Sequence, residues 1–459
     1  MINIEQTKGN LAVSYYNEVG EIEIWNQQIP ESDLFEWAES KTKTSVQSWD
    51  NKWMLKQKTS YLSKWRIKEI IYRLPVDHKI FQIHQPKKFF CDIETFVGDE
   101  WPTAETAKYP VTAITFCNEN NIVTLGCKEL SKTQIKNIEV RVNEYLKAFC
   151  TDLKWSYKYY PSESNMLSDF FNRALPKMPL LTGWNFIDYD WQYLTNRCTN
   201  LGVDISGCSP TGNIVKKSKM PMHRMIVDYL EIYKKWDRTV DIKENDTLDY
   251  VAKQVLGISK VKYNGTIQDL YNNDYETYIF YNVIDTKLVE LIDERINTLN
   301  TFLTLGGITL VEHNDAFSPV RMTEAVIGRE FLKKNRVISS KAASKAGSNT
   351  SYEGAFVHEP VPGMYDFVAS FDFASLYPSI MRQWNMSPES YIGNIKDYSQ
   401  EQIKNANWIK SYTGALFHAE DSVFKIMLTE YYAKRKVSKK MASELEQDIK
   451  NLKLYRDKL

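Results

Sequence analysis

Residues 87–96 have the sequence KKFFCDIETF. Two aromatic residues lead into an alternating pattern, which predicts a buried β-strand. Side chains alternate along a strand, so Asp92 and Glu94 share one face and Ile93 lies on the other. Two adjacent carboxylates repel each other unless cations lie between them, and oxygen ligands favour Mg²⁺ or Mn²⁺. A lone D-x-E pattern is more often a solvated strand edge, so further acids are needed.

A second acidic segment, TGWNFIDYDWQYL, covers residues 182–194 and predicts a turn followed by a helix. Asn185 is placed to cap that helix, because its side-chain oxygen can accept an early helix N–H. Asp190 lies in the opening turns, and Asp188 lies on another face. Acids near helix starts are common because they suit the helix dipole. Alone, this segment is a weak indication of a site.

A third segment, YIFYNVIDTKLVELID, covers residues 278–293 and predicts an amphipathic helix. Tyr281 and Asp285 are four residues apart and therefore neighbours on one helix face. The tyrosine could orient a water molecule held by the metal that the aspartate binds. The alternative is a core tyrosine beside a surface acid, which is the commoner arrangement for an isolated pair.

Taken together, the three segments supply four carboxylates and a tyrosine. A two-metal hydrolase uses one ion to activate water and another, about 3.5–4 Å away, to stabilise the leaving oxygen. The order D-x-E, Asn-x4-Asp and Tyr-x3-Asp resembles the Exo I, Exo II and Exo III motifs of DnaQ-like 3′→5′ exonucleases, in the form found in family-B DNA polymerases. The resemblance implies catalytic and metal-binding roles, with Asp190 preferred to Asp188 because the family's aspartate follows the asparagine by five residues. The implied ligands of two Mg²⁺ ions, for which Mn²⁺ could substitute, are Asp92, Glu94, Asp190 and Asp285, and Tyr281 would position the attacking water.

Residues 365–380 have the sequence YDFVASFDFASLYPSI and form a second constellation. Its apolar alternation predicts a strand with one buried face and Asp372 on the other. The SLYPSI part then turns into a helix, whose free N–H groups can cradle phosphate. An aspartate beside such an anion site would hold Mg²⁺ and an incoming triphosphate together. The alternating residues are Phe367, Ala369, Phe371 and Phe373.

The string D-x-x-S-L-Y-P-S-I resembles motif A of family-B DNA polymerases. The resemblance implies that Asp372 is catalytic and binds metal. It also implies that Ser375 and Leu376 contact the triphosphate. Tyr377 would stack beneath the sugar and exclude a 2′-OH, so that deoxynucleotides are selected.

Two further elements flank this motif. Tyr352, Gly354 and Ala355 match the Y-x-G-G/A element, which in the family contacts template DNA. Arg435 and Lys439 lie one turn apart on a charged C-terminal helix that begins near Val423. A solvated basic face is the usual interpretation of such a run. Their match to the family's fingers helices favours nucleotide binding.

The resemblance is closest to polymerases of T-even-like tailed phages, and it is incomplete in two places. The segment between Ser209 and Asp228 is shorter than the primer-separating hairpin of that group. Its Lys216, Lys217 and Lys219 could touch DNA or form a solvated loop. Motif B (K-x-x-x-N-x-x-Y-G), motif C (D-T-D) and the thumb are absent from the sequence. This chain alone should therefore not polymerise.

Three functions remain open. The chain could be the N-terminal portion of a DNA-directed DNA polymerase whose motifs B and C and thumb come from a second chain. It could instead be a free-standing 3′→5′ single-strand exonuclease, or a non-catalytic nucleic-acid-binding fragment. The expected partners are primer–template DNA, single-stranded 3′ ends, dNTPs and the C-terminal polymerase chain, which could contact a sliding clamp.

Composition sets only broad limits. The 459 residues include 58 Lys and Arg and 58 Asp and Glu, so the net charge gives no indication of whether the protein binds nucleic acid. Local patches bind phosphate, so this balance excludes nothing. Six cysteines without a C-x-x-C pair argue against a zinc site or disulfide framework and favour a reducing compartment. With no signal-peptide run or long apolar stretch, we expect a cytoplasmic protein without a membrane partner, in an infected host cell if phage-encoded.

We expect a mixed α/β fold of about three domains. An RNase H-like exonuclease domain is joined by an α+β N-terminal domain, to which the chain returns after the exonuclease, and by a partial palm and fingers. The small, polar stretch SSKAASKAGSNTS, residues 339–351, predicts an exposed linker. The expected boundaries are 1–87 for the N-terminal domain, 88–298 for the exonuclease, 299–343 for the return segment and linker, 344–421 for the partial palm and 422–459 for the start of the fingers.

Overall fold

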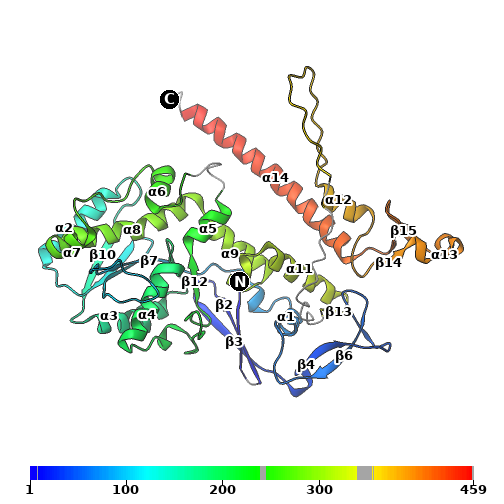
Figure 1. Cartoon of the computed structure of the whole chain (residues 1–459), viewed down its shortest axis with the longest axis horizontal. Helices are drawn as coiled ribbons and strands as arrows, with labels where there is room; N and C mark the ends of the chain where they lie inside the picture. The colour runs from blue at the N-terminus through cyan, green and yellow to red at the C-terminus, as the bar shows by residue number, and fades with distance from the viewer. Residues whose placement is uncertain (8, 238–243, 339–353, 355, 457–459) are drawn as a thin grey trace. The chain divides into compact units, whose positions relative to one another are not determined.

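The structure is a computed structural model, which describes all residues except 8, 238–243, 339–353, 355 and 457–459 (Figure 1). The fold is mixed α/β, as expected. The chain divides into two compact units. The first combines Met1–Ile29 with Pro75–Ala325, and the second combines Pro30–Leu74 with Val326–Leu459.

A six-stranded sheet organises the first unit, in the order β10-β9-β8-β7-β11-β12. The predicted strand over residues 87–96 is confirmed as β7, Lys88–Thr95, in the interior of this sheet. β7 pairs antiparallel with β8 on one side and parallel with β11 on the other. The other strands are β8 (Val111–Asn118), β9 (Asn121–Gly126), β10 (Lys154–Tyr159), β11 (Leu180–Gly183) and β12 (Met225–Asp228).

Helices cover both faces of this sheet (Figure 1). The alternation of β7 divides its side chains between the two layers. Phe90 joins the core beneath α8, whereas Cys91 and Ile93 join the core beneath α3 and α4. Asp92 and Glu94 share the face of Phe90 and therefore point toward α8. The helices are α2 (Lys132–Tyr145), α6 (Leu248–Leu256), α7 (Ile267–Asn273) and α8 (Tyr275–Ile296) on one face, and α3 (Glu163–Asp169) and α4 (Gln192–Leu201) on the other.

The α8 helix confirms the predicted helix over residues 278–293, but its surroundings differ from the expectation. An amphipathic helix exposes one polar face, whereas α8 is buried on most sides, including the charged side chains of Lys287 and Glu290. Those two side chains form an ion pair at 2.5 Å, which makes their burial tolerable. The helix is thus held on several sides, which fixes the direction of the side chains that it points at β7.

A small antiparallel sheet precedes the large one in the same unit. It contains β1 (Asn3–Thr7), β2 (Asn10–Tyr16) and β3 (Ile22–Gln28). Glu5 of β1 accepts hydrogen bonds from Thr211 (2.9 Å) and Asn213 (2.5 Å) and contacts His223 at 2.9 Å. The short segment after Ser209 is therefore tied to this sheet. The same unit holds α5 (Tyr229–Trp236), α9 (Thr298–Thr309) and α10 (His313–Ala316).

The second unit contains two small sheets, with strand orders β13-β5-β6-β4 and β14-β16-β15. The predicted C-terminal helix is confirmed as α14, Val423–Arg456, and the helix after SLYPSI as α12, Leu376–Gln383. The other elements are α1 (Lys64–Tyr72), α13 (Gln400–Asn405), β4 (Phe35–Glu39), β5 (Val46–Ser48), β6 (Trp53–Lys58), β13 (Arg336–Val337), β14 (Tyr391–Asn394), β15 (Trp408–Lys410) and β16 (Ala415–His418), while α11 (Pro319–Lys333) runs from one unit into the other.

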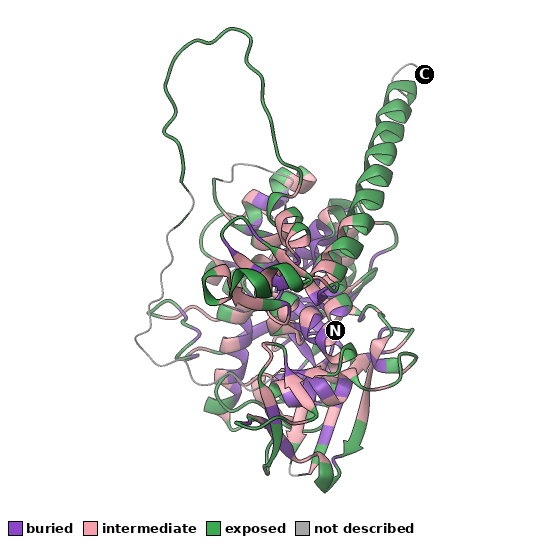
Figure 2. Cartoon of the chain, turned by 90° about the vertical axis from the view of Figure 1, so that its right-hand side faces the viewer, coloured by how far each residue is buried: buried purple, intermediate pink, exposed green. Residues whose placement is uncertain are grey.

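The strand predicted for the segment ahead of SLYPSI is wrong. Residues 356–374 form neither helix nor strand and are exposed almost throughout (Figure 2). Phe367 is 103% exposed and Phe371 94% exposed. A strand is stabilised by hydrogen bonds to a neighbouring strand. Among the described residues none pairs with this segment, so its alternation has no sheet to join.

Candidate active site

The four acids of the first constellation converge at one end of β7. Asp92 and Glu94 come from β7, Asp190 from the π-helical turn η5 (Ile187–Trp191), and Asp285 from α8. The charge of Asp285 raises the pKa of both β7 carboxyls, and the charge of Asp92 raises that of Asp190. The structure thus brings together side chains that are far apart in the sequence.

A main-chain contact fixes Asp190 against β7. The β7–β11 pairing ends at Thr182 and Phe90, so the Ile93 amide lies beyond its parallel neighbour. That amide donates instead to Asp190 Oδ1 at 3.1 Å. Asp190 is buried, whereas Asp188 is exposed. Of the two acids in η5, only Asp190 faces the site.

Burial and mutual repulsion disfavour the charged form of each carboxyl. Burial, followed by the charge of Asp285, raises the pKa of Asp92 to about 7. The same two causes, burial first and neighbouring carboxylates second, raise the pKa of Glu94 and of Asp190 well above their usual range. A positive charge at this point would relieve the repulsion, as a bound dication does.

Lys260 supplies part of that charge. Its ammonium forms an ion pair with Asp285 and lies 5.0 Å from the centre of the Tyr281 ring. Burial opposes the charge of Lys260, but Asp285 and Tyr281 together raise its pKa above the usual range. Sequence reasoning missed this residue, because a lysine in the segment ISKVKYNG has no spacing that relates it to the acids.

Tyr281 lies beside the ion pair. Burial, followed by the charge of Asp285, raises its pKa above the usual value, so its hydroxyl stays protonated and can donate. The Tyr263 ring packs against the Tyr281 ring edge to face, with centroids 5.3 Å apart. Tyr281 is thereby held next to Asp285, as the spacing in the sequence indicated.

The predicted helix cap is wrong. Asn185 has a positive φ of 58° and precedes η5, whose start has no side-chain cap of its own. Asp228, which follows β12, accepts from the Ile187 amide at 3.0 Å and from the Leu230 amide at 2.9 Å. One carboxylate thus fixes the starts of two helices. The sequence could predict that Asp228 caps α5, because the aspartate directly precedes that helix. Its contact with η5 could not be predicted, because it depends on the order of the strands in the sheet.

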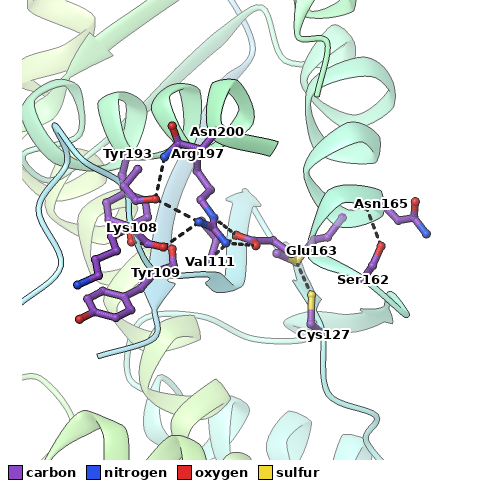
Figure 3. Close-up of polar contacts among 12 residues, drawn as sticks. Lys108, Tyr109, Val111, Cys127, Ser162, Glu163, Asn165, Tyr193, Arg197 and Asn200 are labelled. Carbon is purple, nitrogen blue, oxygen red and sulfur yellow. Dashed lines mark hydrogen bonds and ion pairs between the residues drawn. The ribbon is translucent and has the colours of Figure 1, made fainter. Parts of the chain in front are cut away.

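A polar brace holds the connection that follows Glu94 (Figure 3). Arg197 of α4 pairs with Glu163 at 2.8 Å and donates to the Lys108 carbonyl at 2.9 Å. Tyr193 donates to the Tyr109 carbonyl at 2.8 Å, and Asn200 donates to the Thr106 carbonyl at 2.9 Å. Side chains of one helix therefore position the loop between β7 and β8, next to the acids.

The donor set suits a hard divalent cation. All four acids offer oxygen ligands, and the buried Asp285 Oδ1 has no hydrogen-bond partner among the described residues. Within the same residues, no three Asp, Glu, His or Cys side chains are yet arranged to hold one ion. The ammonium of Lys260 lies beside Asp285 and compensates its charge. The charge and chemistry of the site therefore fit a metal, while its side chains are held apart from metal-binding geometry.

The residues of the second constellation are not brought together. Asp372 and Tyr377 are exposed, as are Arg435 and Lys439 on α14. Ser375 and Leu376 begin α12, where Ser375 adopts a positive φ of 53°. Among the described residues no interaction joins Asp372 to these side chains. Of the predicted template-contacting residues, Gly354 is exposed, and Tyr352 and Ala355 lie outside the described residues, as does the linker over 339–351.

The basic residues of the short segment divide into two kinds. Lys219 donates to the Thr195 carbonyl at 3.3 Å, to Asn196 Oδ1 at 2.9 Å and to Thr199 Oγ1 at 2.6 Å, all on α4. Lys216 and Lys217 are exposed. Lys219 therefore anchors the segment, and only the other two are placed to meet a ligand.

Comparison with known proteins identifies the class. Residues 55–243 match the exonuclease domain of DNA polymerase family B, and residues 323–458 match DNA polymerase family B itself. The acid-bearing α/β unit is thus an RNase H-like exonuclease domain, and the chain belongs to the family-B DNA polymerases. None of the helices that the structure describes is both long and apolar enough to cross a membrane.

The phage relatives narrow the type. The chain is 28% identical over 404 residues to the DNA-directed DNA polymerase of Escherichia phage RB69, covering 80% of this chain and 43% of that protein. It is 28% identical over 362 residues to that of Enterobacteria phage T4, covering 74% and 38%. DNA polymerase 1 of Saccharolobus solfataricus is 26% identical over 376 residues, covering 74% and 38%. The T-even-like resemblance is confirmed, and the chain spans about two fifths of the length of these relatives.

The raised pKa of Asp92 predicts how the site affects stability. An unfolded Asp ionises near 3.8, but Asp92 in the fold keeps its proton up to about pH 7. Ionising Asp92 therefore lowers the free energy of unfolding. This loss grows as pH rises from about 4 and reaches its maximum above about 7. We expect Asp92→Asn to raise Tm in EDTA, by more at pH 8 than at pH 5. Each 1 kcal/mol corresponds to about 2–4 °C for a unit of this size.

Differential scanning fluorimetry measures this difference. Asp188→Asn is the matched control. Asp188 is exposed, so this substitution should leave the Tm of the protein unchanged. Mg²⁺ should raise the Tm of the wild type and thereby reduce the difference in Tm between the wild type and the Asp92→Asn variant. An Asp92→Asn protein no more stable than wild type at pH 8 in EDTA would contradict the electrostatic account.

Proposed function

We propose that this chain is a 3′→5′ exodeoxyribonuclease that removes 3′-terminal nucleotides from DNA by two-metal hydrolysis. The observation that carries the proposal is that Asp92, Glu94, Asp190 and Asp285 lie close enough for their charges to raise one another's pKa, with Tyr281 beside Asp285. The family match to an exonuclease domain supports it. Its substrates are single-stranded 3′ ends and frayed primer ends.

Each residue has a defined task in this proposal. Two Mg²⁺ ions, when bound, supply the Lewis acidity that activates water and stabilises the departing 3′ oxygen. Asp92, Glu94, Asp190 and Asp285 hold them, with Asp92 and Glu94 projecting from one rigid strand. Tyr281, protonated at neutral pH, donates from its hydroxyl to orient the attacking water.

Lys260 has two states in this proposal. Before the cations bind, its ammonium neutralises Asp285 and keeps the repelling carboxylates together. With cations held by the acids, Lys260 would turn from Asp285 and place its charge near the scissile phosphate. It is 29% exposed, so it can move toward a substrate without rearrangement of the core. A cation beside the phosphate stabilises charge that develops in the transition state.

Two adjacent acids test the assignment of the site. We expect Asp190→Ala to lower the rate of 3′-end trimming at least about 100-fold, because it removes a ligand. Asp188→Ala should retain wild-type activity, because that side chain is exposed two residues away. The assay follows a labelled oligonucleotide in Mg²⁺. Equal trimming rates for the two variants would refute the assignment of Asp190. If neither the wild type nor any variant cleaves DNA with any divalent metal, a nucleic-acid-binding function remains.

A pair of lysines tests the role of Lys260. We expect Lys260→Met to lower kcat about 10–100-fold with little change in KM for the oligonucleotide, because the charge acts on the transition state. The nearby Lys262→Met is the control, since Lys262 is exposed and has no contact with the acids. A change confined to KM would instead assign Lys260 to substrate binding.

We propose in addition that residues 344–421 and 422–459 are parts of a polymerase palm and fingers, after an N-terminal domain (1–87 and 299–343) and the exonuclease (88–298). Asp372, Ser375, Leu376, Tyr377, Arg435 and Lys439 would bind dNTP and metal, and Tyr352, Gly354 and Ala355 would contact template DNA. The family match over residues 323–458 supports this. These 459 residues contain no D-T-D motif, so nucleotide addition needs residues from the C-terminal part of a polymerase, whether on the same or on a second polypeptide. That part could also contact a sliding clamp. We place this work in the cytoplasm of an infected host cell, because of the phage relatives.

Primer extension tests this second part. The chain alone should incorporate no dNTP, because Asp372 by itself supplies too little negative charge to hold two dications against a triphosphate. Adding a polypeptide that carries motifs B and C should restore extension, and Asp372→Ala should abolish it. Extension by the chain alone, or by the Asp372→Ala mixture, would refute the proposal.

A further inference from the structure

Asn282 is a buried polar residue at the candidate site with no role in the mechanism above. It lies in α8 between Tyr281 and Asp285, and its side chain is 0% exposed. Its Nδ2 donates to Asp92 Oδ2 at 2.7 Å. The three α8 residues lie within about one helical turn, so one short stretch of helix faces the β7 acids.

The ionised form of Asp92 selects one orientation of this amide. With the amide reversed, its oxygen would face the carboxylate of Asp92, and two acceptors would repel each other. Once Asp92 is ionised, the contact is a charge-assisted hydrogen bond, which is stronger than one between neutral groups. It fixes one oxygen of Asp92 and leaves the other free to meet a cation.

The other end of the amide carries a cost. Asn282 Oδ1 is buried and has no hydrogen-bond partner among the described residues. Leaving such a buried acceptor without a hydrogen bond destabilises the fold. A leucine would fill the same volume without this cost, so packing alone does not account for an asparagine here. The donor to Asp92 is what distinguishes it.

A neutral donor also suits the electrostatics. Lys260 already provides an ammonium, and a second cationic side chain would compete with metal ions for the same carboxylates. An amide orients Asp92 without adding charge. The backbone under it lies in the interior of the regular helix α8, Tyr275–Ile296.

We propose that Asn282 is a positioning residue, which orients the Asp92 carboxylate so that it can bind a divalent cation. The proposal rests on the two-metal function proposed above. Asn282 itself touches neither metal nor substrate. Its removal should therefore weaken metal binding and leave DNA binding intact.

The test compares Asn282→Leu with Thr286→Val in the full chain. Both replace a buried polar side chain of α8 by an apolar one of similar size, but only the first contacts a site acid. Isothermal titration with Mn²⁺ in the absence of DNA measures metal affinity directly. We expect Asn282→Leu to weaken Mn²⁺ binding about tenfold or more, and Thr286→Val to bind as wild type.

Kinetics give a second measurement. The Mg²⁺ concentration for half-maximal exonuclease activity should rise by a similar factor in Asn282→Leu, and saturating Mn²⁺ should restore most of the rate. DNA affinity measured in Ca²⁺ should not change. A residue with a merely structural role would lower Tm without shifting the metal dependence. If Asn282→Leu does not fold, Asn282→Ala, which cannot overpack the site, gives the same comparison.

The outcomes separate the two proposals. If wild type binds Mn²⁺ and trims DNA while Asn282→Leu matches it in metal affinity, the positioning role is refuted and the exonuclease function stands. If wild type neither binds Mn²⁺ nor trims DNA, the two-metal function fails and the role of Asn282 fails with it.

Discussion

Repulsion among buried carboxylates is the constraint on which this structure depends. Two unit charges 4 Å apart interact by about 4 kcal/mol at an effective dielectric constant of about 20, so four acids at one point oppose folding. Burial and like charge raise the pKa of Asp92, Glu94 and Asp190 in response. Lys260 compensates Asp285, and the amides of Ile93 and Asn282 each donate to one acid. These partial compensations are spread around the site and reduce the repulsion among its acids.

The contact between Ile93 and Asp190 arises because β11 is shorter than its neighbour β7. β11 pairs with β7 only as far as Thr182, so the Ile93 amide remains available for Asp190. On the other side of β7, pairing with β8 continues to Thr95 and keeps Asp92 and Glu94 rigid. Helix α8 then crosses the face that these acids occupy. Acids from a strand, a π-helical turn and a helix meet at the point where the parallel neighbour of β7 stops.

Local periodicity made part of this site predictable from the sequence. The period of two placed Asp92 and Glu94 on one face, and the period of the helix placed Tyr281 beside Asp285. The partners that depend on tertiary arrangement were not predictable. Lys260 has no spacing relation to the acids, and Asp228 reaches η5 only because β12 lies next to β11. Asn185 was mistaken for a cap because its type suits one, although its positive φ places it outside the helix.

The segment over 356–374 shows the limit of the same reasoning. Alternation predicts a strand only where another strand can pair with it, and burial of an apolar face needs a second layer. The exonuclease acids meet both conditions within Pro75–Ala325, so the sequence pattern and the fold agree there. The residues around Asp372 meet neither condition among those described, and Phe367 and Phe371 stay exposed. The acids of the first site therefore come together within this unit, whereas Asp372 lies in a segment that joins no sheet among the described residues.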